Sequence, residues 1–331
     1  MDIEHAFDAL QAEADADPAV VAKARERRDL FNTAFSPLDD VVEVIPSGSL
    51  ARNTQRDPIN DVDLVIIFDP AHHHSEWGSD GSSAGDALDY VQEKVRELLG
   101  STEGSVAQEV RLARPGNHAV KCFLDDPKDP DAFTVDAMPA FRHEGGHLVV
   151  PEKANEKWIE TDPEYLIRWV ERRHEDWAEF RSLVRILKMW NQDVGASMKS
   201  LTTEVLALNH LPAEVSRSRA LQRFFSAAEL AIDQPVEDPA GHCGEIQSDL
   251  DLDKVRKCLG DAATKSWRAC DAQDAGDDDA AACLWHEVFG DAFPGPDGGC
   301  PKDDGGGAGA LGAGVGIGIT RPRPVKHAPQ G

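Results

Sequence analysis

Two aspartates at the start of a buried strand constrain this chain more than any other feature. Asp61 and Asp63 precede an unbroken apolar run at residues 64–68, which is typical of a strand buried on both faces. Because side chains alternate along a strand, both carboxylates lie on one face. Unpaired buried charge is costly, and Mg²⁺ is a hard ion that binds carboxylate and phosphate oxygens together. The pattern therefore predicts a metal site where this strand begins.

A Gly-Ser pair upstream predicts a phosphate site beside the metal. Gly48 and Ser49 follow a strand-like stretch at residues 41–46 and open a helix-like segment, whose free N–H groups favour phosphate. A third aspartate, Asp136, lies inside another strand-like stretch at residues 133–138. An Asp-x-Asp pair alone would fit a solvated acidic surface. The joint pattern favours a metal site that serves nucleotide chemistry.

The string from Gly48 to Asp63 resembles the signature of the DNA polymerase β-like nucleotidyltransferases. Later segments resemble the bacterial cyclic GMP-AMP synthase-like enzymes, the CD-NTases of anti-phage signalling, which are related to oligoadenylate synthase. These segments are residues 158–163, 183–191, 198–204 and 288–294. The resemblance covers residues 1–294. It implies an α+β fold, in which a polymerase β-like core of mixed sheet and flanking helices is fused to a helical lobe, with the active site in the cleft between them.

The resemblance also implies roles for the motif residues. Asp61 and Asp63 would hold the ion that binds the triphosphate, and these two with Asp136 would hold a second ion that activates the attacking hydroxyl. Two Mg²⁺ ions are therefore the expected cofactors, with Mn²⁺ able to substitute. Gly48 and Ser49 would position the β- and γ-phosphates.

Basic residues follow one side of the helix expected at residues 177–194. Arg181, Arg185 and Lys188 recur at helical spacing beside an apolar stripe. An ordinary solvated face would explain them in most helices, but in so acidic a chain they need an anion or a row of carboxylates opposite. The resemblance implies that Lys188 and Ser200 contact the nucleotide triphosphate, with Lys199 nearby.

The sequence assigns no platform for the base. Leu201 and Thr202 stand where relatives often carry an aromatic residue and a histidine. Trp158 and Trp190 are the aromatic candidates, and core packing is the favoured interpretation of both.

The expected reaction is attack by a ribose hydroxyl of one nucleotide on the α-phosphate of another, with release of pyrophosphate. ATP, GTP or both are the expected substrates. Repetition and ring closure into a cyclic oligonucleotide second messenger are implied by the resemblance alone. One alternative is a nucleotidyltransferase that modifies a tRNA or a protein, which would need a basic groove or a target-binding domain. Another is an inactive nucleotide-binding scaffold, which the intact aspartates disfavour.

Composition limits partners and location. The formal charge is −26, with 60 acidic and 34 basic residues, so binding of bulk nucleic acid is not expected. The sequence shows neither a secretory signal nor an apolar run of about 18 residues, so we expect a cytoplasmic protein without a membrane span.

The six cysteines contain no Cys-x-x-Cys pair, and we expect reduced thiols. His242 and Cys243, with Cys258, match no trusted zinc spacing. The run of three histidines at residues 72–74 lies in a Gly/Ser-rich stretch and is interpreted as a loop with incidental metal affinity.

Three regions are expected. Residues 1–160 would form the catalytic core, with a helix at residues 1–35 that packs across both lobes and a strand at residues 106–112. Residues 161–293 would form the helical lobe, and residues 294–331 a disordered Gly/Pro-rich tail. The tail is interpreted either as a solubilising segment or as a handle for a conjugating or effector partner.

Overall fold

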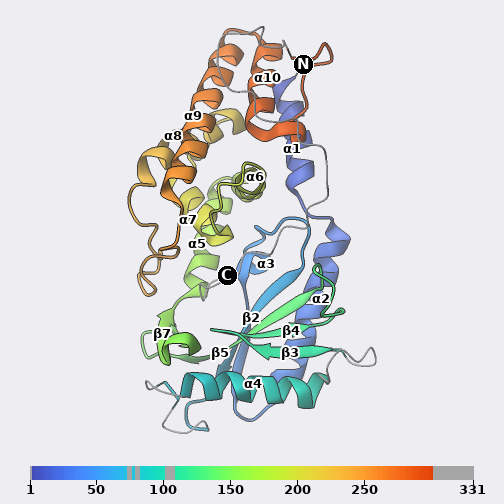
Figure 1. Ribbon diagram of the computed structural model, residues 1–331, viewed down its shortest axis with the longest axis vertical. Coiled ribbons are helices and arrows are strands. Elements are labelled where there is room, and N and C mark those ends of the chain that lie inside the picture. Colours follow the sequence, from blue (N-terminus) through green and yellow to red (C-terminus); the bar gives the residue numbers. More distant parts are fainter. Residues whose placement is uncertain (1, 73–76, 79–82, 101–108, 301–331) are drawn as a thin grey trace.

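The computed structural model describes residues 2–72, 77–78, 83–100 and 109–300. Strands gather at one end of the long axis and most of the later helices at the other (Figure 1). This arrangement is the α+β fold expected from the sequence, with a sheet-based core and a helical lobe.

A seven-stranded mixed sheet forms the core. Its main path runs in the order β1-β2-β5-β4-β3, β6 pairs with β5, and β7 pairs with β6. Only the β2–β5 pair is parallel among the strands of the described residues. The bounds are β1 Val41–Ser47, β2 Asp61–Phe68, β3 Leu112–Pro115, β4 Val120–Phe123, β5 Thr134–Arg142, β6 Leu148–Glu152 and β7 Lys157–Thr161.

The two faces of the sheet have different environments. One face packs against α2 (Pro18–Phe35) and α4 (Ser83–Leu99), and it buries alternate residues of each strand, such as Val62 and Leu64 of β2. Helix α4 runs along the side of the sheet away from the helical lobe (Figure 1). The positions between these residues, including Asp61 and Asp63, therefore lie on the opposite face.

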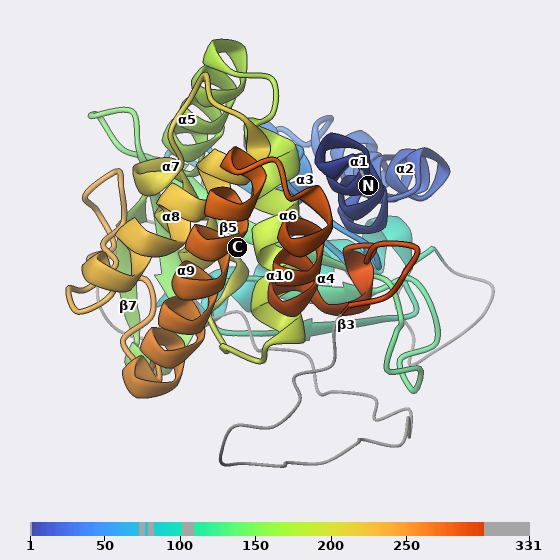
Figure 2. The ribbon, with the colours of Figure 1, turned by 90° about the horizontal axis from the view of Figure 1, so that it is seen from above.

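Amphipathic helices form the second lobe. Their bounds are α5 Pro163–Asp176, α6 Phe180–Asp193, α7 Ser200–His210, α8 Arg217–Ala231, α9 Leu252–Asp274 and α10 Asp278–Phe289. Helix α9 packs against both α8 and α10 (Figure 2). Helix α6 crosses the middle of the lobe, and Trp190 on it is 1% exposed. The expected helices of this region are confirmed.

The N-terminal segment forms two helices where a single helix was predicted. Helix α1 (Ile3–Ala14) ends before Asp17, whose side chain caps α2 by accepting from the Ala19 N–H at 2.6 Å. Pro18 occupies the first turn of α2, where its missing N–H costs nothing. The prediction of one continuous helix was wrong because this capping signal ends one helix and begins another.

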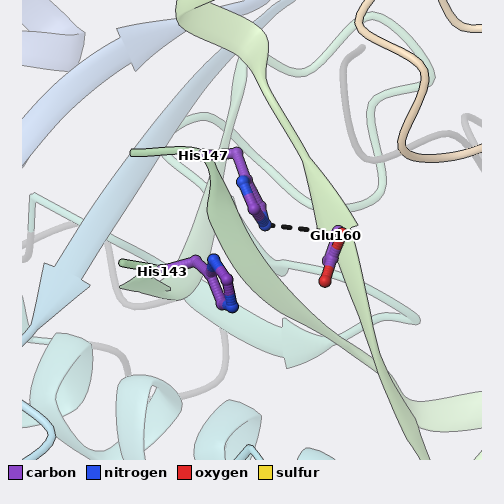
Figure 3. A group of neighbouring side chains, drawn as sticks. All are labelled: His143, His147 and Glu160. Atoms are coloured by element: carbon purple, nitrogen blue, oxygen red, sulfur yellow. Dashed lines mark ion pairs between the residues drawn. The ribbon is translucent and has the colours of Figure 1, made fainter. Parts of the chain in front are cut away.

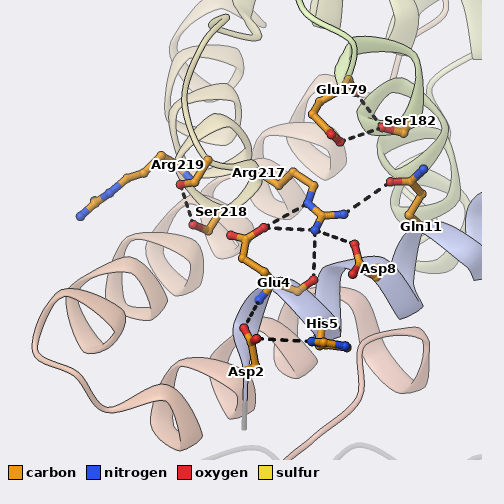
Figure 4. A network of polar contacts seen from close by, with 11 residues as sticks. Asp2, Glu4, His5, Asp8, Gln11, Glu179, Ser182, Arg217, Ser218 and Arg219 are labelled. Atoms are coloured by element: carbon orange, nitrogen blue, oxygen red, sulfur yellow. Dashed lines mark hydrogen bonds and ion pairs between the residues drawn. The ribbon is translucent and has the colours of Figure 1, made fainter.

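The two N-terminal helices serve different lobes. Helix α1 packs in the core of the helical lobe, where the Phe7 ring meets the edge of Trp285 at 5.3 Å. On its outer side, Arg217 of α8 donates to the Asp8 carboxylate at 2.7 Å and to the Glu4 carbonyl at 3.0 Å (Figure 4). Helix α2 packs on the sheet. The N-terminal segment therefore bridges the lobes, although Ile3–Ala14 belongs to the helical one.

The end of the described chain is covalently attached to α10. Cys283 and Cys300 form a disulfide, with their Cα atoms 5.5 Å apart. The expectation of reduced thiols was therefore wrong for this pair. Residues 294–300 are described and tethered, whereas the rest of the predicted tail, residues 301–331, lies outside the described residues.

Two strands escaped the sequence patterns and one was displaced. β6 and β7 each have five residues, too few for a periodic signal, and they form a hairpin against β5. A strand was predicted at residues 106–112, of which 106–108 lie outside the described residues, and β3 begins only at Leu112. Among the described residues, no helix combines the length and apolarity that crossing a bilayer requires.

Candidate active site

The three aspartates meet on the open face of the sheet. Asp63 pairs in register with Asp136 across the parallel β2–β5 ladder, and Asp61 lies two residues earlier on the same face. Neighbouring strands are about 4.8 Å apart, so the carboxylates of Asp63 and Asp136 project side by side. The strand register thus brings Asp63 and Asp136 together, although they are 73 positions apart in the chain.

Gly48 closes the site from the side of β1. Strand β1 ends at Ser47, which pairs with Asp63, and the chain then turns into the short helix α3 (Gly48–Arg52). Gly48 has a φ of +70°, and a Cβ built on it would lie 1.8 Å from Asp63 Oδ2. Only glycine allows the backbone to approach the carboxylate so closely at this φ.

Two basic residues extend the row of carboxylates across the sheet. Lys121 of β4 pairs in register with Asp136, and Arg114 of β3 pairs with Lys121. Facing residues in antiparallel pairs share a face, so the row reads Ser47, Asp63, Asp136, Lys121, Arg114. Sequence reasoning missed both cations. Their alternation with the apolar residues of β4 and β3 was the available signal.

The residues present fit a divalent-cation site. Three carboxylates on one face, contributed by two adjacent strands, form the hard oxygen donor set that Mg²⁺ prefers. A Cβ at Gly48 would overlap the Asp63 carboxylate, so the glycine allows that carboxylate to keep its place on this face. Asp61, Asp63 and Asp136 would hold the ions.

Lys188 lies in a buried network between α6, α7 and the residues after α3. Its side chain is 6% exposed, and its ammonium donates to Glu204 at 2.6 Å, to the Thr54 carbonyl at 3.1 Å and to the Thr54 hydroxyl at 3.2 Å. An ammonium has three donors, and these bonds direct it toward Glu204 and Thr54. The structure thus places Lys188 beneath the turn that follows α3, and its contact with a triphosphate stays a prediction.

Glu204 is the centre of this buried network, which joins the lobes. It is fully buried on α7 and accepts from Arg52 of α3 at 2.5 Å and from the Thr54 hydroxyl at 2.8 Å. Burial would raise the pKa of Glu204, but Arg52 and Lys188 outweigh it and lower the pKa to about 2. The carboxylate is therefore ionised throughout the neutral range and fixes α3 to the helical lobe.

Two of the three cations predicted on α6, Arg185 and Lys188, meet carboxylates, one of the two kinds of partner expected for them. Arg185 donates to the Asp15 carboxylate at 2.5 Å and to the Asn53 carbonyl at 2.8 Å. Together with Lys188, it holds the carbonyls of residues 53 and 54. The basic face of α6 supports the turn behind Gly48 and Ser49.

Ser200 and Lys199 lie where α7 begins. Ser200 is exposed and stands one turn before Glu204, so both lie on the same side of α7. The Lys199 N–H donates to Gln247 at 2.7 Å, and the Lys199 ammonium lies 3.7 Å from Asp249. Gln247 fixes the start of this helix, and no sequence motif indicated it. The triphosphate contacts of Ser200 and Lys199 stay predictions.

Trp190 lies in the core of the helical lobe, and the half-buried Trp158 packs against the core beneath the sheet. Trp190 meets Phe225 edge-to-face at 4.9 Å, and Trp158 donates from its indole to the Ser83 hydroxyl at 2.9 Å. These contacts are the core packing that the sequence interpretation favoured for both.

A cavity of about 520 Å³ lies beside the site rather than in it. Arg56, Asn60, Glu13 and Asp193 are among its lining residues, which come from the segment before β2 and from α1 and α6. None of the predicted site residues lines it.

No family model matches the chain. It is 24% identical over 307 residues to the cyclic AMP-AMP-GMP synthase of Enterobacter hormaechei, an alignment that covers 81% of this chain and 80% of that protein. It is also 24% identical over 173 residues to the cyclic AMP-AMP-AMP synthase of Acinetobacter sp., where the alignment spans 48% of this chain and only half of the relative.

The fold has solved counterparts. The structure of E. coli MS115-1 CdnC with ATP superposes with a TM-score of 0.67 at 18% identity, covering 89% of this chain and 99% of that one. At this level of identity, the similarity shows only that the two proteins share a fold.

Proposed function

We propose that this chain, which belongs to the bacterial cyclic GMP-AMP synthase-like nucleotidyltransferases, joins nucleoside triphosphates into a cyclic oligonucleotide and releases pyrophosphate. The register of Asp63 with Asp136, with Asp61 on the same face and Gly48 against the Asp63 carboxylate, carries the proposal. The relatives named as cyclic trinucleotide synthases support the class of product.

Asp61, Asp63 and Asp136 would hold two Mg²⁺ ions, which when bound neutralise phosphate charge and lower the pKa of the attacking hydroxyl. Gly48 and Ser49 would position the β- and γ-phosphates with their backbone N–H groups, and glycine lets this turn lie against the Asp63 carboxylate. These residues thus orient the triphosphate for in-line attack.

Lys121 and Arg114 extend the proposed nucleotide-binding surface along the sheet. Their side chains lie on the face of Asp136, beyond the carboxylates, where a second nucleotide would place its phosphates. We assign them to the nucleotide that supplies the attacking hydroxyl. Lys199 and Ser200, at the start of α7, are assigned to the other triphosphate, with the buried network of Lys188 beneath.

Labelled ATP and GTP, incubated with the protein and Mg²⁺ or Mn²⁺ and then treated with phosphatase, test the proposal. A cyclic product keeps its label because it has no terminal phosphate. Linear products that lose their label would contradict ring closure, and the absence of any product would contradict the enzyme assignment. The Asp61→Asn, Asp63→Asn protein is purified in parallel as a control, because any synthesis in that sample comes from a contaminant.

The predicted role of the tail is tested separately. Residues 301–331 would bind a conjugating or effector partner, so truncation after Cys300 should keep the disulfide, the melting temperature and the basal synthesis. If the tail is such a handle, the truncation should impair signalling only in cells that contain the partner. If the truncated and full-length chains signal equally in those cells, the tail is only a solubilising segment.

A further inference from the structure

A cluster of imidazoles lies away from the aspartates, at the end of the β5–β6 hairpin. His143 and His147 flank its turn, and Glu160 reaches them from β7, which pairs in register with β6. The two rings lie face to face with centroids 4.3 Å apart, and Glu160 approaches the edge of His147 (Figure 3). One possible ligand atom from each of the three lies within 4.8 Å of the others.

A third imidazole from the helical lobe lies beside this group of three and contacts two of its members, His147 and Glu160. The loop between α8 and α9 brings His242 against His147, with ring centroids 4.2 Å apart. The Asp238 carboxylate shapes this loop by accepting from the His242 and Cys243 N–H groups, each at 3.0 Å. The Cys243 thiol donates to the Glu160 carbonyl at 3.1 Å, which fixes the loop on β7. His242 had no recognisable partner in the sequence because its neighbours are about 80 to 100 positions away.

The two contacts of Glu160 with imidazoles, one of them a hydrogen bond, are long and equal the separation of two ligands on one metal ion. Glu160 Oε2 lies 3.4 Å from His147 Nε2 and 3.3 Å from His242 Nδ1. Good N–H···O bonds are about 2.7–3.2 Å long. Ligands 2.0–2.1 Å from a tetrahedral zinc ion stand about 3.3–3.4 Å from one another. His147 Nε2 is enclosed and has no hydrogen bond among the described residues.

We propose that His143, His147, Glu160 and His242 bind one zinc-class divalent ion that joins the β5–β6 hairpin of the core to the 238–244 loop of the helical lobe. Three imidazoles and one carboxylate suit zinc or a neighbouring transition metal, whereas Mg²⁺ prefers oxygen ligands. The site is therefore chemically distinct from the aspartates. Because the ligands come from both lobes, ion binding stabilises their association.

The four ligands are not equivalent. His147 is mostly buried and already points at Glu160, so it needs the least movement. His143 is exposed, and its Nδ1 accepts from the Gly145 N–H at 3.1 Å, a bond that competes with a metal for the imidazole. Replacement of His143 should therefore weaken binding less than replacement of His147.

Zn²⁺ titration of the full chain against a chromophoric chelator tests the site. We expect one tightly bound equivalent and a higher melting temperature with Zn²⁺ than without it. His147→Gln and His242→Gln should each lower the Zn²⁺ affinity about 100-fold or more, because even outer-shell partners of zinc ligands contribute 10–100-fold. Co²⁺ in place of Zn²⁺ should give intense tetrahedral visible bands in the wild-type protein and lose them in both variants.

The three histidines at residues 72–74 provide the matched control. Their joint replacement by glutamine should leave the tight equivalent intact, because none of them is a proposed ligand. Circular dichroism without added metal shows whether His147→Gln and His242→Gln fold. The proposal is overturned if no stoichiometric Zn²⁺ binds, or if the replacement at residues 72–74 removes the binding. Unchanged affinity in His242→Gln would overturn the link between the lobes.

Discussion

Arg52 donates to Glu204 at 2.5 Å, although 152 positions separate them in the sequence. Arg52 ends α3, the short helix that begins at Gly48, and Glu204 lies inside α7 of the other lobe. With Lys188, the buried group contains two cations and one carboxylate. It therefore holds the phosphate-binding turn against the helical lobe, and removal of different members should have unequal costs.

Glu204→Gln should destabilise the protein more than Lys188→Met. Loss of the carboxylate leaves two buried cations without their counter-ion, a change that costs about 3–5 kcal/mol. Loss of Lys188 leaves the balanced pair of Arg52 and Glu204 and costs about 1–2 kcal/mol in hydrogen bonds. Urea denaturation measures both, with exposed Lys257→Met as the control. Equal costs would contradict this account of the network.

The same two variants test the predicted triphosphate contact of Lys188. If Lys188 only supports α3, Lys188→Met should bind nucleotide with an affinity close to wild type at temperatures where it is fully folded. A loss of more than about tenfold in the folded variant, equivalent to about 1.4 kcal/mol, would support a direct contact.

Glu204 also predicts the acid stability of the fold. Its pKa is about 2 in the folded protein against an ordinary value of 4.5, so its contribution is complete above pH 4.5 and is lost as the pH falls toward 2. At about 1.4 kcal/mol per pKa unit, the difference corresponds to about 3 kcal/mol. The gap in unfolding free energy between wild type and Glu204→Gln should therefore stay constant from pH 7 to 5 and narrow below pH 4.5. A constant gap down to pH 3 would contradict the low pKa.

Local patterns predicted the elements well but not the long-range contacts. The run at residues 64–68 identified β2 because alternation and apolarity are properties of neighbouring residues. The partners of Lys188 were not predictable, because Thr54 and Glu204 become its neighbours only when the lobes pack. The same cause hid His242, whose ring stacks on a hairpin whose strands are too short for a periodic signal. Charged residues on a helix indicate that a partner exists, but only the folded structure shows which residue that partner is.

The double substitution Asp61→Asn, Asp63→Asn should abolish synthesis while preserving the fold. Asparagine keeps the shape but not the charge that a divalent ion requires, and loss of several kcal/mol of transition-state stabilisation lowers the rate about 1000-fold or more. Removal of crowded like charges should also keep or raise the melting temperature in chelator. Turnover and thermal unfolding check the two parts, and near-wild-type synthesis with Mg²⁺ would disprove the site.

Lys121→Met should raise the KM for nucleotide with little change in stability. Lys121 lies beside Asp136 on the open face, where its charge can attract phosphate. Loss of one charged contact should weaken binding by about 1.5–3 kcal/mol, or about 10- to 150-fold. The exposed Lys128, in the loop between β4 and β5, provides the control as Lys128→Met. Equal KM values for both variants would remove Lys121 from the binding face.

Gly48→Ala should abolish synthesis because the added Cβ would collide with Asp63. Gly276→Ala is the control that distinguishes this collision from backbone strain. Gly48 and Gly276 both have positive φ, +70° and +78°, so alanine strains the backbone at either position. A Cβ on Gly276 meets nothing within 4 Å, whereas a Cβ on Gly48 would overlap the Asp63 carboxylate. Gly276→Ala should therefore cost about 1 kcal/mol of stability and keep its turnover. Gly48→Ala must displace either Asp63 or the phosphate-binding turn, and its turnover should fall far more than its melting temperature. Parallel losses of turnover in the two variants would show that strain alone, and not the contact with Asp63, explains the glycine.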